Sequence, residues 1–297
     1  MLDFRHETFL ALSRIGSYTK TAQALNITQP AVSQHIRHLE EQYNGKLFCY
    51  TGKTLTLTER GRLLRDFAMT MSADSKKLQT ILSASSTAPP PVIFGATLTI
   101  GEYTMPSVLA GLMTAHPNLH ITMLVDNTSV LLGKLRDGTI DFALLEGFCD
   151  KTQYGGAVLA REPFIPVCSP QSPLAGRRVQ LGELLPFRLI LRENGSGTRD
   201  IFEQLLREHN LTTNSFAHLC EVGNMSAIKQ LVSAGLGVTF LYRAAVAREL
   251  AAGTLVEIDI DGFSAEREFN FVFLQNSLHE QQYMQWFTAF QGLLPHP

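Results

Sequence analysis

The stretch "TAQALNITQPAVSQHIRHLEEQ", residues 21–42, contains two short helical patterns on either side of a tight break at residues 26–29. In the second pattern, apolar residues recur every three or four positions, as they do on one face of an α-helix: Val32, Ile36, Leu39 and Tyr43. Thr28 is a favourable N-cap for this helix, and Pro30 is tolerated in its first turn. Two helices joined by a short turn, with small alanine side chains where they meet, are typical of a helix-turn-helix unit.

The face of the second helix that points away from the core carries forked hydrogen-bonding groups. They gather in its first half: Gln29, Ser33, Gln34 and Arg37. Glutamine and arginine pair bidentately with the edges of adenine and guanine, whereas the acids Glu40 and Glu41 in the second half would be repelled by phosphate. An ordinary solvated helix face does not explain this separation, so the pattern predicts that the first half of the helix reads bases in DNA.

A wing and a long helix are predicted after the helix-turn-helix. Residues 47–50 and 54–58 are strand-like, and the turn between them contains Lys53, which could reach a phosphate. A helix should then run from Thr58 to about Ala84, with an apolar seam interrupted by one acid: Leu64, Phe67, Met71, Asp74, Leu78 and Ile81. Such a seam suits a two-stranded coiled coil, and we expect it to join two copies of the chain rather than to pack on its own domain.

Charge is distributed unevenly along the chain. Residues 1–65 contain nine Lys and Arg against five Asp and Glu, a balance of +4, whereas residues 66–297 contain 16 against 22, a balance of −6. A basic head on an acidic body favours contact between the head and a polyanion. The chain has no apolar run of the roughly 20 residues that span a bilayer and no signal-like start, which favours a cytoplasmic protein without membrane contact.

Nothing in the sequence indicates a metal site or a cofactor. The four cysteines lie far apart, without the spacing of zinc ligands: Cys49, Cys149, Cys168 and Cys220. Reduced thiols are therefore expected, with a redox-sensing cysteine as the alternative. No glycine motif for a nucleoside triphosphate or a dinucleotide follows a predicted strand.

The proline-rich segment "SSTAPPP", residues 85–91, ends the long helix and is predicted to form a hinge. Beyond it, short apolar strands alternate with helical patterns, beginning with "VIFGAT" (92–97), "LHITMLV" (119–125) and "DFALLEG" (141–147). A second set begins with "RLILRE" and ends with "VTFLY", after which "EFNFVFLQN" and a last helix close the chain. This alternation predicts parallel α/β sheets that are covered by helices on both faces.

Three polar turns follow predicted strands of this body, and ligands of open α/β sheets bind beyond the carboxyl ends of the strands. The turns contain Thr97 and Thr99; Asn127 and Thr128; and Gly195, Ser196, Gly197 and Thr198. In the third turn, "RENGSGTR", the glycines allow close approach of backbone N–H groups, the hydroxyls add donors, and the following helix dipole favours an anion. If the three turns converge, they form a pocket for a small anion.

Glu146 follows the third strand and is expected at the same edge of the sheet. A buried carboxylate beside an oxyanion is costly unless one of the two is protonated or a cation intervenes. If Glu146 faces the pocket, a compact and readily protonated oxyanion such as sulfite, or a monocarboxylic acid, is favoured over sulfate. The alternative is that Glu146 turns to solvent or pairs with Arg199.

The N-terminal unit resembles that of LysR-type transcriptional regulators. The resemblance covers the phenylalanine-rich first helix, "GSYTKTAQALNITQPAVSQHIRHLEEQYNGKLF", the wing exit "LTLTERG" and the long helix. It implies base contacts by one group of residues and backbone contacts by another: Gln29, Pro30, Ser33, Gln34 and Arg37 for bases, and Thr28 and Lys53 for the backbone. Two positions differ from the usual family pattern, because Gln34 and Tyr50 stand where arginine is frequent.

The resemblance also implies an α/β fold in three parts. A winged helix-turn-helix domain would occupy residues 1–58, and a dimerisation helix with its hinge would occupy residues 59–91. An effector-binding domain of two lobes, similar to a type II periplasmic binding protein, would follow at residues 92–297. The lobes would comprise residues 92–161 with 267–297, and residues 162–266.

The "GSGTR" turn resembles the branch of the family that senses sulfur oxyanions, phosphate-bearing metabolites or small carboxylates (the CysB-, CysL- and CbbR-like regulators). We therefore expect a DNA-binding regulator, not an enzyme, that binds an operator with paired half-sites and is switched by a small anion such as sulfite, sulfate or a small carboxylate. The family implies a homodimer and, usually, a homotetramer. The alternatives are a redox-sensing regulator and an anion-binding enzyme fused to a DNA-binding head, in which Glu146 is the candidate acid or base.

Overall fold

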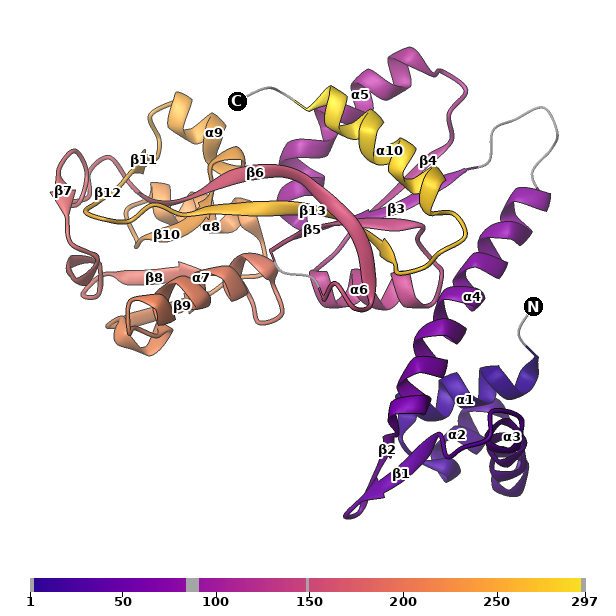
Figure 1. The fold of residues 1–297 in the computed structure, drawn as a ribbon. Coiled ribbons are helices and arrows are strands. Elements are labelled where there is room, and N and C mark those ends of the chain that lie inside the picture. Colours follow the sequence, from indigo (N-terminus) through magenta and orange to yellow (C-terminus); the bar gives the residue numbers. More distant parts are fainter. Residues whose placement is uncertain (1–2, 84–90, 148–149, 295–297) are drawn as a thin grey trace.

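The computed structural model describes residues 3–83, 91–147 and 150–294 of the chain. Figure 1 shows a small head that contains the N-terminus, a long helix α4, and an elongated body in which helices surround strands. The predicted fold class, a winged helix-turn-helix head followed by an α/β body, is confirmed. None of the helices in these described ranges is long and apolar enough to cross a membrane.

The head is a three-helix unit with a two-stranded wing. Its elements are α1 (Phe4–Ile15), α2 (Tyr18–Leu25), α3 (Gln29–Gln42), β1 (Phe48–Thr51) and β2 (Thr54–Leu57). Asp3, Ser17 and Thr28 set the helix starts, because each accepts a backbone N–H with a side-chain oxygen. Gly16 and Asn26 end α1 and α2 in the left-handed conformation, with φ of 69° and 54°. The apolar faces meet in one core: Phe9, Leu12, Val32, Ile36, Leu39 and Leu47.

Helix α4 (Glu59–Ser83) packs on the body of its own chain through a row of polar side chains at helical spacing. The row bonds to two segments of the body. In residues 275–278, Thr70 donates to the carbonyl of Gln275 (3.1 Å), and Asp74 accepts the hydroxyl of Ser277 (2.6 Å) and the N–H of Leu278 (2.8 Å). Lys77 pairs with the carboxylate of Asp141 (2.6 Å). Asp74 and Lys77 are both buried. These contacts fix the direction in which α4 leaves the body.

The predicted coiled-coil seam is therefore wrong at two of its positions. Leu64 is buried in the core of the head, and Asp74 is a buried acceptor that serves the body rather than a gap in the seam. Phe67 and Leu78 are exposed, as are their neighbours Leu63 and Leu82, so α4 keeps an apolar stripe that the described part of the chain does not cover. The hinge predicted at residues 85–91 lies outside the described residues, apart from Pro91.

The main sheet of the body is mixed, whereas the sequence predicted parallel sheets. Its strands are β3 (Val92–Ala96), β4 (Ile121–Val125), β5 (Phe142–Glu146), β6 (Tyr154–Cys168), β10 (Thr239–Tyr242), β11 (Val256–Glu257) and β13 (Glu266–Leu274). Their order is β10-β6-β13-β5-β3-β4, and β11 also pairs with β6. β3 is parallel to β4 and β5, but β13 is antiparallel to β5 and β6 because the chain returns to this sheet from the far end of the body.

Helices and short strands complete two lobes around this sheet. The first lobe carries η1 (Ile100–Thr104), α5 (Met105–Ala115), α6 (Thr128–Arg136) and α10 (Glu280–Leu293). The second lobe carries β7 (Arg178–Val179), η2 (Leu181–Leu184), β8 (Arg188–Leu191), α7 (Gly197–Glu208), η3 (Thr213–Ser215), β9 (His218–Glu221), α8 (Met225–Ser233), α9 (Arg243–Ala251) and β12 (Asp259–Ile260). β8 is parallel to β9, and β7 is parallel to β12.

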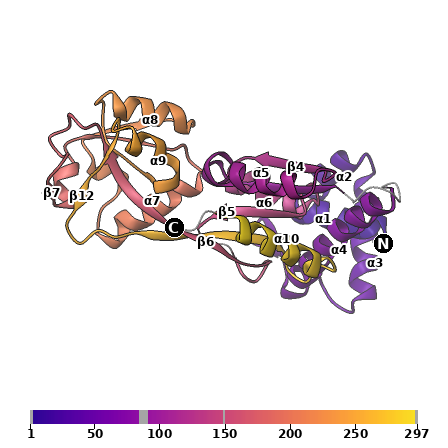
Figure 2. The ribbon, with the colours of Figure 1, turned by 90° about the horizontal axis from the view of Figure 1, so that it is seen from above.

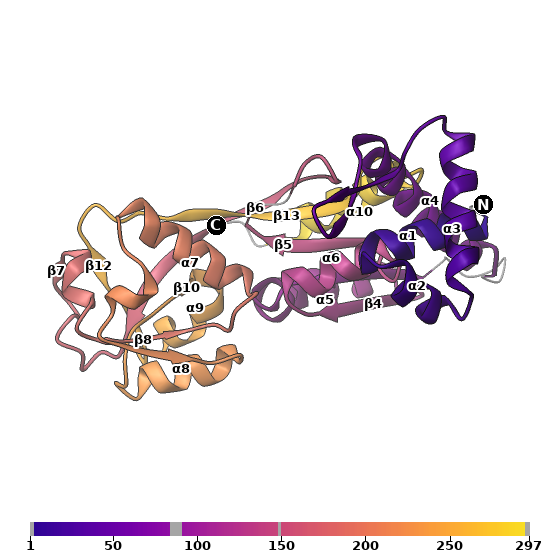
Figure 3. The same cartoon turned by 90° about the horizontal axis from the view of Figure 1, so that it is seen from below.

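Two long strands, β6 and β13, run side by side from one lobe to the other (Figures 2 and 3). β6 pairs with β13 from Tyr154 to Pro163 and then with β10 from Phe164 to Val167. The sequence analysis identified β13 but not β6. The partner of β6 thus changes from β13 to β10 between Pro163 and Phe164.

An aromatic core fixes the strands that carry the candidate ligand site. The ring of Phe142 on β5 lies 5.2 Å from that of Phe94 on β3 and 4.5 Å from that of Phe271 on β13, centroid to centroid. Phe290 of α10 packs on all three rings. Because β3 and β5 are adjacent and parallel, their carboxyl ends meet at one edge of the sheet, where ligands of such sheets bind.

Candidate functional site

The first half of α3 lies on the surface of the head. Of the residues predicted to contact DNA, all but one are exposed: Thr28, Gln29, Pro30, Gln34, Arg37 and Lys53, with Ser33 half-buried. The opposite face of α3 is buried in the core of the head. Lys53 lies in the turn between β1 and β2, the wing that projects from the head (Figure 1).

The exposed polar groups of α3 already have local partners. The amide nitrogen of Gln29 donates to the hydroxyl of Ser33 at 3.0 Å, and the guanidinium of Arg37 pairs with the carboxylate of Glu41 at 2.9 Å. The Arg37 and Glu41 side chains are 80% and 63% exposed, and an ion pair so exposed contributes at most about 1 kcal/mol. Arg37 can therefore exchange Glu41 for a base or a phosphate at little cost.

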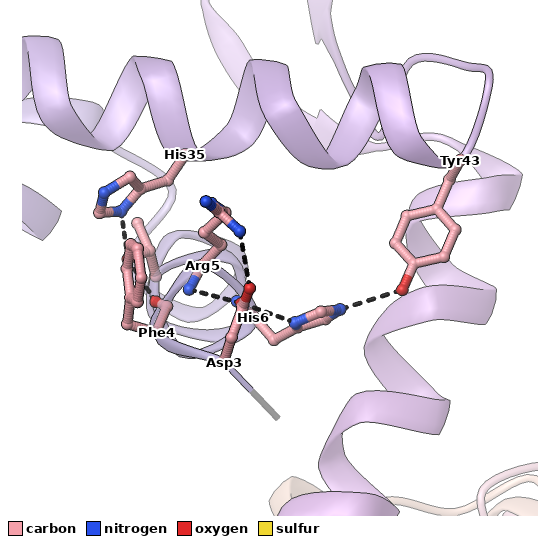
Figure 4. Close-up of polar contacts among 7 residues, drawn as sticks. Asp3, Phe4, Arg5, His6, His35 and Tyr43 are labelled. Carbon is pink, nitrogen blue, oxygen red and sulfur yellow. Dashed lines mark hydrogen bonds and ion pairs between the residues drawn. The ribbon is translucent and has the colours of Figure 1, made fainter. Parts of the chain in front are cut away.

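Contacts at the middle and at the C-terminal end of α3 hold it against α1 (Figure 4). In its first half, Nδ1 of His35 lies 3.0 Å from the hydroxyl of Thr8, which donates its own proton to the carbonyl of Phe4, so His35 must be the donor. At its end, Nε2 of His6 lies 3.0 Å from the hydroxyl of Tyr43. His35 and Tyr43 therefore orient α3 from the side that faces α1.

The candidate ligand residues on β3 and β5 lie together at the edge of the sheet. Thr97 directly follows β3, and its N–H donates to the carbonyl of Leu144 on β5 at 3.0 Å. Glu146 ends β5 and is 4% exposed, while Thr97 and Thr99 are 3% and 0% exposed. Glu146 therefore faces the interior and not the solvent.

The start of α7 meets this edge from the second lobe. The hydroxyl of Thr198 donates to a carboxylate oxygen of Glu146 at 2.7 Å. A Cβ atom on Gly197 would lie 3.1 Å from the hydroxyl oxygen of Thr128 and 3.5 Å from Cβ of Glu146, so glycine allows this close approach. The structure thus brings Thr128, Glu146, Gly197 and Thr198 together.

The other predicted residues of these turns have defined local roles. Asn127 caps α6, since its side-chain oxygen accepts the N–H of Val130 at 3.0 Å and the hydroxyl of Ser129 at 2.8 Å. Gly195 has a φ of +85°, which favours glycine, and Ser196 is buried directly before α7 without forming a capping hydrogen bond. Arg199 pairs with Glu203 and Glu221, so the alternative pairing of Arg199 with Glu146 does not occur.

Buried hydroxyls without partners gather in this region. Four buried side-chain oxygens here have no hydrogen-bond partner in the described parts of the chain: those of Thr97, Thr99, Thr128 and Tyr242. A buried polar group without a partner costs about 1–3 kcal/mol, and in native proteins it usually has a functional reason. These hydroxyls, together with the Glu146 carboxylate, define the candidate ligand site.

The sequence analysis missed Tyr242. This residue ends β10, is 0% exposed, and packs its ring edge-on against Phe269, which pairs with Glu146 across the sheet. Burial and then the negative charge of Glu146 raise the pKa of Tyr242 well above its usual value, so the hydroxyl keeps its proton at neutral pH. Its position at the end of the predicted strand "VTFLY" was the signal that could have identified it.

A groove of about 740 Å³ lies beside the ligand site, with Gly147, Ile201, Gln204 and Asn270 among its lining residues. None of the buried unpartnered oxygens in the described chain belongs to its walls. The groove is large enough for a small molecule, but the unsatisfied polar groups lie in the neighbouring cluster. We therefore place the candidate site at the cluster of hydroxyls.

The described cysteines are free, and they differ in exposure. Cys49 is exposed, Cys220 is half-buried and Cys168 is buried, whereas Cys149 lies outside the described residues. Burial raises the pKa of Cys168, which disfavours the reactive thiolate. Within the described ranges, no group of three or more His, Cys, Asp or Glu side chains could hold a metal ion.

Comparison with known proteins identifies both parts of the chain. Residues 5–62 match the model of bacterial regulatory helix-turn-helix proteins of the lysR family, and residues 90–291 match the LysR substrate binding domain. The chain is 33% identical over 254 residues to YeiE, an uncharacterized HTH-type transcriptional regulator of Escherichia coli K12. The matched region covers 86% of this chain and 85% of that protein.

Solved structures show the same fold. A mutant of OxyR from Corynebacterium glutamicum aligns with a TM-score of 0.63 and 24% identity, covering 97% of this chain and 90% of that one. The regulatory domain of CcmR from Synechocystis PCC6803, in complex with 2-PG, aligns with a TM-score of 0.60 and 21% identity, covering 68% of this chain and 97% of that one.

A winged helix-turn-helix head joined to a two-lobed effector-binding body defines a ligand-responsive transcriptional regulator. The chain belongs to the LysR family of these regulators. The family resemblance predicted from the head is therefore confirmed for the body as well.

The unpartnered hydroxyl of Tyr242 leads to a prediction about stability. Tyr242→Phe should increase the free energy of unfolding of the ligand-free protein by about 1 kcal/mol, because it removes a buried donor that has no partner. Tyr154→Phe is the matched control and should decrease it, since the buried Tyr154 hydroxyl accepts a hydrogen bond from Nε of Arg136 at 3.0 Å. Urea titration followed by circular dichroism measures both. A loss of stability in Tyr242→Phe would mean that its hydroxyl is satisfied.

Proposed function

We propose that this regulator senses a small, compact oxyanion held between the two lobes of its body, and that it reads operator DNA with the first half of α3. The observation that carries the first part is the cluster of buried, unpartnered hydroxyls around Glu146 and the start of α7. The DNA-binding part rests on the exposed glutamine and arginine side chains of α3. The ligand is expected to be released unchanged, as befits a receptor and not an enzyme.

The start of α7 favours an anion. Its first-turn N–H groups receive no side-chain cap from Ser196, so they remain available to a ligand. The positive end of the helix dipole adds to their attraction for negative charge. Hydroxyls of Thr97, Thr99, Thr128 and Tyr242 supply further donors from the surrounding elements. The complex of the CcmR regulatory domain with 2-PG supports a small anionic effector for a body of this fold.

Glu146 restricts which anion is accepted. While Glu146 is ionised, Thr198 commits its only hydroxyl proton to that carboxylate, so these two side chains offer a ligand only acceptors. An anion that retains a proton can donate to the corner, whereas a fully ionised dianion would be repelled. Protonated sulfite or a monocarboxylic acid therefore fits better than sulfate. In this arrangement Thr198 is a partner of Glu146 and not, as expected from the sequence, a direct donor to the anion.

We also propose the division of the body into a lobe of residues 92–161 with 267–297 and a lobe of residues 162–266. The exchange of partners along β6 between Pro163 and Phe164 supports this division. Both crossing points then lie close to the candidate ligand site. A ligand held there contacts both lobes.

A homodimer through α4 is the fourth part of the proposal. Its support is the exposed apolar stripe of α4, in which Leu63, Phe67 and Leu82 are 75%, 59% and 75% exposed. A second copy of α4 packed on this stripe would bury it and leave Leu64 and Asp74 in their own chain. Pairs of such dimers would form the tetramer that the family implies.

For the ligand site, Glu146→Gln should improve sulfate binding by about tenfold or more and reduce the preference for protonated anions, most clearly at higher pH. Calorimetric titration with sulfite, sulfate, phosphate and acetate measures this. Glu59→Gln, which changes an exposed carboxylate at the start of α4, is the control and should bind like the unmodified protein. Unchanged affinities for all four anions would remove Glu146 from the site, and the absence of binding by any of them to either protein would contradict an oxyanion effector.

For DNA binding, Gln29→Ala should cost about 1–3 kcal/mol on an operator selected from random duplexes and little on unselected DNA, because a base contact is lost and phosphate contacts are kept. Fluorescence anisotropy at two salt concentrations measures both affinities. Gln42→Ala, at the exposed end of the same helix, should leave both unchanged. Equal losses on the two DNAs would instead assign Gln29 to the DNA backbone.

For the dimer, the double variant Phe67→Glu with Leu78→Glu should be monomeric in sedimentation velocity. Its head should stay folded, because both positions are exposed in the single chain. Leu64→Glu should unfold the head, since Leu64 belongs to its core. Gln79→Glu, which adds charge at an exposed polar position of α4, is the control. A double variant that remains fully dimeric would locate the interface elsewhere.

A further inference from the structure

A buried lysine lies where the two lobes meet, outside the ligand site. Lys229 on α8 is 7% exposed. Its ammonium donates to the carbonyl of Ala245 at 2.9 Å and pairs with Glu249 at 2.7 Å, both on α9. A buried charge is costly even when it is paired, and an apolar side chain in its place would avoid this cost. The contacts within the second lobe therefore do not by themselves account for a lysine here.

The third contact of Lys229 comes from the other lobe. Its nitrogen lies 4.6 Å from the centre of the Tyr103 ring. Tyr103 belongs to η1, between β3 and α5, yet its ring packs against the core of the second lobe, which includes Ile190, Met225 and Ile228. η1 contacts α9 directly, and Figures 1 and 2 show the start of α5 beside α9. The cation is attracted to the face of the ring, and shielding from water strengthens the attraction.

η1 connects this contact to the ligand site. It is a π-helical turn, in which the N–H of Met105 bonds to the carbonyl of Ile100. Such turns are rare and often mark functional sites. Thr99, whose buried hydroxyl has no partner in the described chain, immediately precedes the turn, and Tyr103 lies near its end. One short turn therefore carries a candidate ligand group at one end and the contact with Lys229 at the other.

The turn is also held firmly from the first lobe. The N–H of Gly101 donates to the carbonyl of Thr97 at 2.8 Å. A Cβ atom on Gly101 would lie 2.7 Å from a methyl carbon of Val125, so the turn packs closely on β4. A displacement of Tyr103 is then transmitted to Thr97 and Thr99 instead of being absorbed within the turn.

We propose that Lys229 is a positioning residue for the ligand site: through the ring of Tyr103 it fixes the π-helical turn that carries Thr99, and it thereby couples ligand binding to the relative placement of the two lobes. The proposal rests on the proposed function for the role of Thr99. Burial raises the pKa of Tyr103, so its ring stays neutral and acts through its face rather than as a phenolate. The contact that the geometry gives is between the ammonium and the ring, at 4.6 Å from its centre, so the ring is the group to be tested.

Hydrogen–deuterium exchange on the full-length protein tests the proposal without any ligand. Lys229→Met keeps the aliphatic stem and removes the charge, Tyr103→Leu removes the ring, and Tyr103→Phe keeps the ring as the matched control. Lys229→Met and Tyr103→Leu should raise the exchange rates of amides in residues 97–105 by about tenfold or more, and Tyr103→Phe should not. Faster exchange confined to α8 and α9, or equal exchange in all variants, would overturn the proposal. If Lys229→Met fails to fold, the exchange rates of residues 97–105 in Tyr103→Leu and Tyr103→Phe decide whether the proposal holds.

A second measurement separates this proposal from the proposed effector. With sulfite as the probe in calorimetric titration, Lys229→Met and Tyr103→Leu should bind at least about tenfold more weakly than the unmodified protein, and Tyr103→Phe should bind equally. Failure of sulfite to bind the unmodified protein would count against the effector class alone, because the exchange experiment decides the positioning role. Equal sulfite affinity in all four proteins would show that Lys229 does not act on the ligand site.

Discussion

The antiparallel pairing of β6 with β13 is the constraint on which the rest of the body depends. Gly156 has a φ of +144°, and a Cβ atom there would overlap the carbonyl oxygen of Phe271 on the partner strand, so only glycine allows the two strands to approach. Strand β13 positions both sides of the candidate ligand site. Glu146 pairs with Phe269 in the sheet, and Tyr242 packs on the ring of Phe269. A change in the register of this pair would therefore separate the groups that the ligand must contact at the same time.

Local patterns predicted the elements that have strong local causes. The stripe of Val32 and Ile36 with a Thr28 cap specified α3, and hydroxyl-bearing turns after short strands specified most of the candidate ligand site. β6 escaped because "YGGAVLAREPFIPVC" contains two glycines and two prolines, which weaken strand propensity, and its conformation comes from its neighbours β13 and β10. Asp74 was misassigned for a similar reason, since its partner Ser277 lies 203 positions away in the sequence.

The candidate site shows a conflict between stability and recognition. Valine has nearly the same shape as threonine and could replace Thr97, Thr99 and Thr128. The chain would gain stability, because the buried hydroxyls without partners would be removed. Their retention is understandable if the protein folds around a polar ligand that satisfies them, because binding energy then replaces the missing internal bonds. Sequence patterns reveal the hydroxyls but not their isolation, which depends on the closure of two lobes.

The bonds between α4 and its own body have a mechanical consequence. Thr70, Asp74 and Lys77 attach about 10 Å of the helix to the body, and the head grips the same helix through Leu64. Head, helix and first lobe thus move as a single lever. The anchored segment lies about 17–27 Å from the head end of the helix, so a tilt of about 10° there would displace that end by about 3–5 Å. A movement of the first lobe therefore carries the head and its helix α3 with it.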